Sequence, residues 1–196
     1  GPDRRFVAMP AYLGGRFDVC GVKWYGSNQA NPSKGLPRSV LTVQLNDKDT
    51  GEPLCLMSAN LLSAMRTGAV PGVATRYLIR KNSEIAAAIG CGPINESCFQ
   101  AIRSQAPGLK KLLCFDVFEE KAQAFADWAK KELNIEGVVA KSLEECFSTA
   151  DVVTVAASRL KPLQLESTWL KKGITILMSG PAKGDDAFWA GHRIVY

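Results

Sequence analysis

Short apolar or alternating runs, separated by turn residues, make up the first part of the chain. The runs cover residues 6–9, 18–25, 40–45 and 54–57, and the intervals between them contain turn formers such as glycine, proline and asparagine. Alternation with period two and turn formers between the runs predict β-strands joined by turns. No run here repeats apolar residues with a helical period, so we expect a sheet without helices.

After residue 60 the pattern changes to helices alternating with strands. Residues 60–81 have helical character, but Pro71-Gly72 interrupts them, which predicts either two helices or one kinked helix. Further amphipathic runs predict helices over residues 93–105, 119–133 and 143–149. Apolar runs predict strands over residues 84–90, 111–117, 137–141, 151–157, 174–178 and 193–196.

Strands that alternate with helices form βαβ units, which build a parallel sheet covered on both faces. The fold class expected here is therefore α/β, with a doubly wound Rossmann sheet preceded by part of a β-rich domain. We expect a partial β-rich domain over residues 1–60, a connecting helix region over 61–82 and a dinucleotide-binding domain over 83–196. The first sheet would have no helix to cover it, and no helix would follow the last strand. This incomplete architecture predicts a fragment of a longer protein.

Composition narrows the class of protein. Of the 196 residues, 46% are hydrophobic and 22% are charged, which is globular composition and excludes collagen, coiled coil and disorder. No apolar run approaches the ~20 residues of a membrane helix, and the opening residues 1–5 lack the apolar region of a signal peptide. We therefore expect no membrane association.

Charge and cysteine content exclude further classes. The net charge of +5 is modest and its lysines and arginines are dispersed, so nucleic acid is not an expected partner. The six cysteines include no CxxC pair, which predicts reduced core thiols in a cytoplasmic protein. His192 is the one histidine, so His-based metal sites and Ser–His catalysis are not expected.

A glycine turn links the predicted strand over residues 84–90 to the helix that follows. Gly90 suits a tight turn, Gly92 lets the backbone approach a pyrophosphate, and Pro93 with Ile94 opens the helix. The exposed N–H groups and the dipole of such a helix bind an anion. The third glycine of the dinucleotide fingerprint is replaced by Asn95, which weakens the motif.

An acidic residue in the expected place strengthens it. Asp116 closes the second predicted strand, where an acid hydrogen-bonds the ribose 2′-hydroxyl of the cofactor. An acid there repels a 2′-phosphate, and residues 117–119 contain no arginine or lysine, so NAD is favoured over NADP. The alternative is a Rossmann-like fold whose degenerate turn binds no nucleotide.

Several motifs resemble the ornithine cyclodeaminase/mu-crystallin family along essentially the whole chain. They are Gly21-Val22-Lys23-Trp24-Tyr25-Gly26-Ser27-Asn28, then Asn31, Gly35-Leu36-Pro37-Arg38-Ser39, Asp47 with Thr50-Gly51-Glu52-Pro53-Leu54, and Met65-Arg66-Thr67-Gly68-Ala69. The resemblance implies a homodimer, with a central NAD domain and a substrate and dimerisation domain built from both chain ends. Members of the family are longer, in agreement with a fragment.

The resemblance also implies roles for individual residues. Lys23 matches the lysine that contacts the substrate carboxylate, and Arg66, with Thr67 beside it, matches the arginine that contacts the dinucleotide phosphates. Taken alone, Lys23 could be an exposed edge-strand lysine, and Arg66 a surface arginine of a helix.

The chain departs from the family at the catalytic acid. Family cyclodeaminases carry an aspartate after the fifth strand of the dinucleotide domain, and an ungapped alignment places Ala182 there. Asp185 or Asp186 could substitute only if the loop follows a different path. A second substrate-contacting arginine of the family would lie before Gly1.

The family reaction implied by this resemblance passes through an imine, with NAD⁺ accepting hydride from the α-carbon of an amino acid. The motifs resemble most the branch of dehydrogenases of 2,3-diaminopropionate biosynthesis. Together with the missing aspartate, this favours an NAD-dependent oxidoreductase acting on an amino acid or an N-linked amino-acid conjugate. The alternatives are an ornithine cyclodeaminase and a non-catalytic, mu-crystallin-like binding protein.

Overall fold

The computed structural model describes residues 4–157, 162–191 and 195. Compact packing divides the chain into two units, Gly1–Ala64 and Met65–Tyr196, and helix α1 (Asn60–Leu78) spans the boundary between them.

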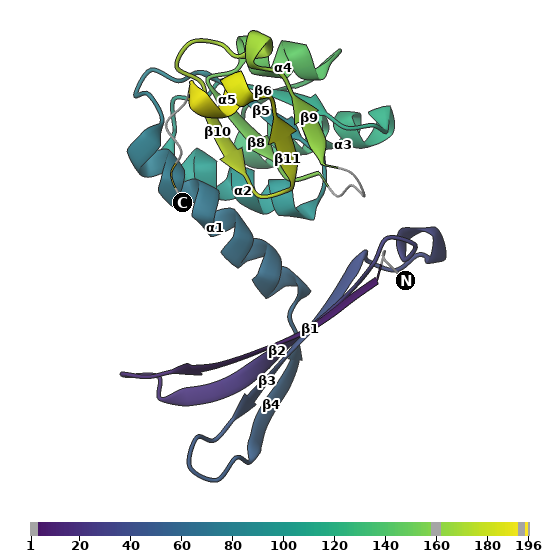
Figure 1. Cartoon of the computed structure of the whole chain (residues 1–196), viewed down its shortest axis with the longest axis vertical. Coiled ribbons are helices and arrows are strands. Elements are labelled where there is room, and N and C mark those ends of the chain that lie inside the picture. The colour runs from purple at the N-terminus through teal and green to yellow at the C-terminus, as the bar shows by residue number, and fades with distance from the viewer. Residues whose placement is uncertain (1–3, 158–161, 192–194, 196) are drawn as a thin grey trace. The chain divides into compact units, whose positions relative to one another are not determined.

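The first unit is an antiparallel sheet in which the strand order follows the chain (Figure 1). Its strands are β1 (Arg4–Leu13), β2 (Val19–Asn28), β3 (Ser39–Asn46) and β4 (Pro53–Ser58). All four predicted strands are confirmed, although β1 is longer than its apolar run because both of its flanks pair with β2. A short 3-10 turn, η1 (Pro32–Lys34), lies between β2 and β3.

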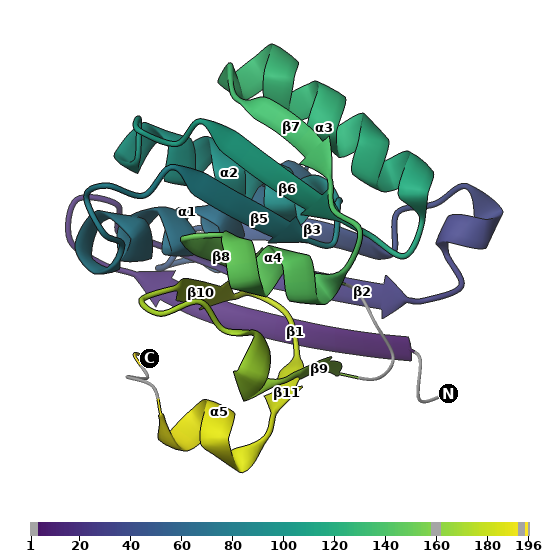
Figure 2. The ribbon, with the colours of Figure 1, turned by 90° about the horizontal axis from the view of Figure 1, so that it is seen from above.

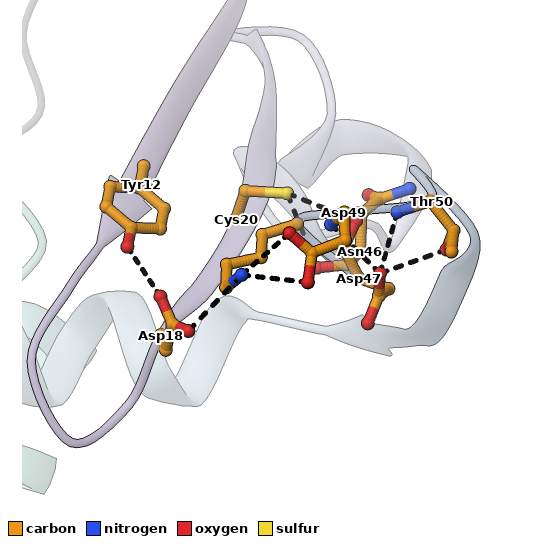
Figure 3. Close-up of polar contacts among 8 residues, drawn as sticks. Tyr12, Asp18, Cys20, Asn46, Asp47, Asp49 and Thr50 are labelled. Carbon is orange, nitrogen blue, oxygen red and sulfur yellow. Dashed lines mark hydrogen bonds and ion pairs between the residues drawn. The ribbon is translucent and has the colours of Figure 1, made fainter.

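Polar contacts join the two hairpin ends of this sheet (Figure 3). The Tyr12 hydroxyl donates to Asp18 Oδ1 at 2.5 Å, and this hydrogen bond raises the pKa of Tyr12. Lys48 Nζ lies 3.5 Å from Asp18 Oδ2 and 2.7 Å from Asp49 Oδ1. The ion pair between Lys48 and Asp18 thereby links the β3–β4 turn to the β1–β2 turn.

The second unit holds a five-stranded parallel sheet in the order β10-β8-β5-β6-β7. Its strands are β5 (Ile85–Ile89), β6 (Lys111–Phe115), β7 (Glu136–Val139), β8 (Val152–Val155) and β10 (Thr175–Met178). Numbered along the chain, this order is that of a doubly wound dinucleotide-binding sheet. The predicted α/β fold class is confirmed.

Helices cover both faces of the parallel sheet (Figure 2). Helices α2 (Pro93–Gln105) and α3 (Glu119–Leu133) pack on one face, and α4 (Leu143–Thr149) packs on the other. Alternation along β5 directs Ala86 and Ala88 into the first core and Ala87 and Ile89 into the second. The bounds of these three helices are as predicted.

Helix α1 continues through Pro71 as a single helix, so the alternative of two separate helices over residues 60–81 is wrong. Its glycines lie against α2: a Cβ on Gly68 would lie 2.4 Å from the carbonyl carbon of Ser97, and one on Gly72 would lie 2.7 Å from the Cβ of Ala101. Tertiary packing therefore keeps a helix that Pro71 weakens locally.

Two short strands and a short helix were not predicted. Strands β9 (Leu163–Leu165) and β11 (Ala182–Gly184) form a separate parallel pair, followed by α5 (Asp186–Ala190), and a 3-10 turn, η2 (Ser167–Trp169), follows β9. Three-residue strands are too short to show a period. The sixth strand predicted over residues 193–196 lies outside the described residues except for Val195, which is not in a strand. No helix in the described ranges has the length and apolar character needed to cross a membrane.

Candidate functional site

The turn after β5 has the geometry that its first glycine predicts. Gly90 has a φ of +89°, and its N–H donates to the Phe115 carbonyl at 2.8 Å. A Cβ on Gly90 would lie 2.8 Å from the Cα of Ala157. Both the positive φ and the close approach of β8's continuation therefore require glycine at this position.

The second glycine leaves open space at the start of α2. Gly92 caps the helix with extended backbone (φ −128°, ψ 177°) and no side-chain cap, and Pro93 is the first helical residue. Within the described ranges, no acceptor pairs with the N–H groups of Gly92, Ile94 or Asn95, and a Cβ on Gly92 would meet nothing within 4 Å. Unpaired N–H groups at an open helix N-terminus fit a pyrophosphate.

Asp116 lies beside this turn, as its spacing predicts. Its Oδ2 accepts the Cys91 N–H at 2.9 Å, and its Oδ1 accepts the Phe118 N–H at 3.1 Å. An ionised carboxylate has about four acceptor sites, so both oxygens retain capacity for ribose hydroxyls. The spacing of the motif does not predict the hydrogen bond to Cys91, which joins Asp116 to the middle of the glycine turn.

Asn95, which the sequence marked only as a weakness of the motif, is fully buried at the turn. Its Nδ2 donates to the Gly90 carbonyl at 2.6 Å and to the Ile89 carbonyl at 3.1 Å. Asparagine in place of the third glycine therefore adds polar contacts to the turn. An amide at a fingerprint position that otherwise takes a small residue is the sequence signal that could have revealed it.

Arg66 and Thr67 lie on α1, in the second unit together with the glycine turn. Both residues lie in the second turn of this helix, which begins at Asn60. Arg66 is exposed, and the next residue but one, Gly68, packs on Ser97 in the second turn of α2. The close packing at Gly68 therefore attaches this part of α1 to the helix that begins at Pro93.

Lys23 lies in the middle of β2, half-buried, in the first unit. Its direct cross-strand partners are Met9 on β1 and Val43 on β3, and Pro10 lies opposite Val22. Directly opposed residues share a face, so Lys23 stands on an apolar face. None of the ion pairs among the described residues includes Lys23.

The two weak candidates for a catalytic acid lie at the start of α5. Asp185 caps this helix: its Oδ1 accepts the Phe188 N–H at 2.6 Å, and its Oδ2 accepts the Ser167 hydroxyl at 2.9 Å. These bonds, chiefly the one from Phe188, lower the pKa of Asp185. Asp186 is exposed in the first turn of α5, and Ala182 lies in β11. Asp185 therefore has a structural use at the helix cap.

The cysteines are unpaired, and four of the six are buried. Burial raises the pKa of Cys98 to about 11 and that of Cys146 to about 12. Cys20 and Cys55 are only partly buried, so the expectation of six core thiols is wrong for these two. Within the described part of the chain, no group of three His, Cys, Asp or Glu residues is placed to hold a metal. His192 lies outside the described residues.

Comparison with known proteins places these features in a family context. The sequence profile of the ornithine cyclodeaminase/mu-crystallin family matches residues 1–189. N-((2S)-2-amino-2-carboxyethyl)-L-glutamate dehydrogenase of Staphylococcus aureus is 33% identical over 174 residues, which are 88% of this chain and 52% of that protein. Alanine dehydrogenase of Archaeoglobus fulgidus is 34% identical over 179 residues, or 90% of this chain and 53% of that protein.

A solved structure gives the same relation. Thermococcus litoralis Δ(1)-pyrroline-2-carboxylate reductase, in complex with NADH and L-proline, matches with a TM-score of 0.84 and 32% identity. The match covers 94% of this chain and 61% of that chain. The present chain spans about half the length of the curated relatives it matches.

Proposed function

The chain belongs to the ornithine cyclodeaminase/mu-crystallin family, and we propose that it is part of an NAD-dependent oxidoreductase that works on amino acids. The substrate is an amino acid or an N-linked amino-acid conjugate, which reacts at its α-carbon through an imine. The observation that carries this proposal is the glycine turn at Gly90 and Gly92, with Asp116 bonded to it, at the carboxyl end of a Rossmann-ordered sheet. Relatives named as dehydrogenases and reductases support it.

Residues of the turn and of helix α1 fit NAD in three respects. The N–H groups of Gly92, Ile94 and Asn95 supply donors for the pyrophosphate, and the open space at Gly92 admits it. Asp116 supplies acceptors for the adenosine ribose. Arg66 and Thr67 supply a guanidinium and a hydroxyl for the phosphates, as the family motif implies. When bound, NAD⁺ would accept hydride from the substrate α-carbon, or NADH would donate hydride to it.

Lys23 supplies the cation that the substrate carboxylate requires. A carboxylate held next to a nicotinamide loses its hydration, and it must pair with a protein charge to bind there. Lys23 carries such a charge on a face formed by apolar partners, Met9 and Val43. Its ammonium would pair with the carboxylate of the substrate.

The residue at the position of the family's catalytic aspartate bears on the type of reaction. Ala182 cannot titrate, and Asp185 is engaged at the cap of α5, so ornithine cyclisation is the less favoured reaction of the family. A mu-crystallin-like binding protein is the second candidate, favoured by the same alanine. A panel of amino acids and N-linked conjugates, mixed with NAD⁺ and the full-length protein, separates these functions by absorbance of the reduced nicotinamide. Accumulation of NADH supports the oxidoreductase. Release of ammonia from ornithine without net NADH supports the cyclodeaminase, because that reaction returns the hydride, and tight binding with neither product supports the binding protein.

Asp116→Asn is expected to erode the preference for NAD. The variant keeps an acceptor for the Cys91 N–H but removes the charge that would repel a 2′-phosphate. Two negative charges about 4 Å apart repel by about 1 kcal/mol in water and by about 4 kcal/mol near a protein surface. The ratio of NADP to NAD affinity should therefore rise about fivefold or more. Calorimetric titration of both nucleotides measures this ratio. Asp127→Asn, on the exposed side of α3, is the control, and an unchanged ratio in Asp116→Asn would refute the assignment.

The full-length protein is expected to be a homodimer through its strand-rich first unit. One face of that sheet exposes large apolar side chains, namely Phe6, Tyr12, Trp24, Val40 and Leu56. Val22 shares this face but is half-buried, whereas Leu41 lies on the opposite face and is buried. A solved alanine dehydrogenase relative, 34% identical, is described as a dimer. Such a patch on a single-layer sheet needs a covering surface.

Light scattering at micromolar concentration should give the mass of two chains. Trp24→Glu should shift this mass toward one chain, whereas Leu36→Glu, in the loop after η1, should not. A wild-type protein with the mass of one chain would exclude the dimer. A reducing compartment such as the cytoplasm suits the six unpaired cysteines.

A further inference from the structure

Asn95 makes contacts that its place in the glycine motif does not require. It is 1% exposed, and its Nδ2 serves the carbonyls of Ile89 and Gly90. Its Oδ1 is buried and has no hydrogen-bond partner in the described part of the chain. The amide orientation follows from this environment, because only an NH₂ group can donate to two carbonyl oxygens.

The unpaired oxygen makes Asn95 a costly choice for packing alone. A buried acceptor without a donor destabilises the folded protein, and a glycine or alanine here would avoid that cost. The third residue of the fingerprint serves the close packing of helix on strand, for which a small side chain is sufficient. The two bonds made by Nδ2 must therefore have a use.

These bonds complete the fixation of the turn. In the peptide group between Ile89 and Gly90, the carbonyl accepts from the Ala156 N–H at 3.0 Å as well as from Asn95, and the N–H donates to Phe115. In the next peptide group, the Gly90 carbonyl accepts from Asn95 and the Cys91 N–H donates to Asp116. Every polar atom of both peptide groups is thus held by a fixed partner, which leaves the N–H groups from Gly92 onward for a ligand.

We propose that Asn95 is a positioning residue of the nucleotide site: its amide holds the two peptide groups of the turn in the orientation that binds the pyrophosphate. This inference rests on the proposed NAD site. Because Asn95 acts through the backbone, its loss should weaken nucleotide binding without removing any group that touches the nucleotide. A protein with glycine or alanine at position 95 should therefore bind NAD more weakly than the wild type does.

The first test is Asn95→Ala in the full-length protein, titrated with NAD by calorimetry. Affinity is expected to fall about tenfold or more, while the thermal unfolding midpoint changes little, because the lost bonds are offset by removal of the unpaired oxygen. Asn82→Ala, at an exposed asparagine in a turn, should bind as the wild type does. Affinity of Asn95→Ala within twofold of the wild type would overturn the proposal.

Asn95→Asp provides a readout that a packing role would not change. A carboxylate facing two carbonyl oxygens in a buried site has a raised pKa, and only its protonated form can donate to the Gly90 carbonyl. NAD affinity relative to the wild type should therefore be lowest near about pH 8 and recover as the pH falls toward about 5.5. Dividing by the wild-type value removes the contributions of Asp116, Cys91 and Glu96, which both proteins share.

The outcomes separate the two proposals. If Asn95→Ala fails to fold, the pH profile of Asn95→Asp decides, and a flat ratio overturns the positioning role. If the wild type binds NAD, and Asn95→Ala and Asn95→Asp bind it as tightly as the wild type does, the role proposed for Asn95 is wrong but the NAD site stands. If the wild type binds no NAD, the proposed function fails and takes this inference with it.

Discussion

Replacing Lys23 by methionine is expected to lower kcat/KM for the amino-acid substrate about 30- to 900-fold, or about 2–4 kcal/mol. Methionine preserves the length and apolar packing of the side chain between Met9 and Val43, but it leaves the substrate carboxylate without a partner. NAD affinity should remain nearly constant, because Lys23 is assigned to the substrate alone. Steady-state kinetics and calorimetry on the full-length protein measure the two quantities.

Two further variants sharpen this result. Lys23→Arg should also be impaired, because a planar guanidinium on a longer stem displaces a contact suited to a point charge. Lys34→Met, at an exposed lysine of η1, is the control and should leave kcat/KM unchanged. A wild-type kcat/KM in Lys23→Met would mean that Lys23 is a solvated strand lysine and that the carboxylate binds elsewhere.

Gly90→Ala is expected to destabilise the protein by about 2–5 kcal/mol. A side chain at a φ of +89° is strained by about 1–3 kcal/mol, and a Cβ 2.8 Å from the Ala157 Cα adds the cost of overpacking. Urea unfolding followed by far-UV circular dichroism measures the loss. The midpoint should decrease in proportion to this free energy.

Gly92→Ala is the matched control for that substitution. The backbone of Gly92 is extended, and its Cβ would meet nothing within 4 Å, so stability should stay within about 1 kcal/mol of the wild type. NAD affinity should nevertheless fall, because the methyl group would occupy the space that the pyrophosphate approaches. Equal stability loss in both variants would contradict the distinct roles assigned to the two glycines.

The regular part of the fold could be predicted because its sequence signals are local. Helix α3, for example, combines acidic residues in its first turn, lysines in its last and a buried apolar stripe, so its bounds follow from the chain alone. The continuity of α1 could not be predicted in this way. It depends on Gly68 and Gly72 packing against α2, a tertiary contact that overrides the local effect of Pro71.

The candidate site likewise has features that the sequence predicts and features that depend on the folded structure. Gly90, Gly92 and Asp116 follow from spacing, since a strand, a turn and a helix determine where the next strand ends. The bond from Cys91 to Asp116 and the two bonds of Asn95 depend on side-chain directions within the folded turn. Residue types and spacings do not contain those directions, so Asn95 was interpreted as a defect of the motif.

Calorimetric titration of the full-length protein with NAD, and separately with NADP, tests the nucleotide site most directly. We expect saturable binding of one NAD per chain, tighter than the binding of NADP. The unpaired N–H groups at the start of α2 would bind the pyrophosphate, and Asp116 would accept hydrogen bonds from the ribose and repel a 2′-phosphate. No binding of NAD, or tighter binding of NADP, would contradict the assignment of this turn as an NAD site.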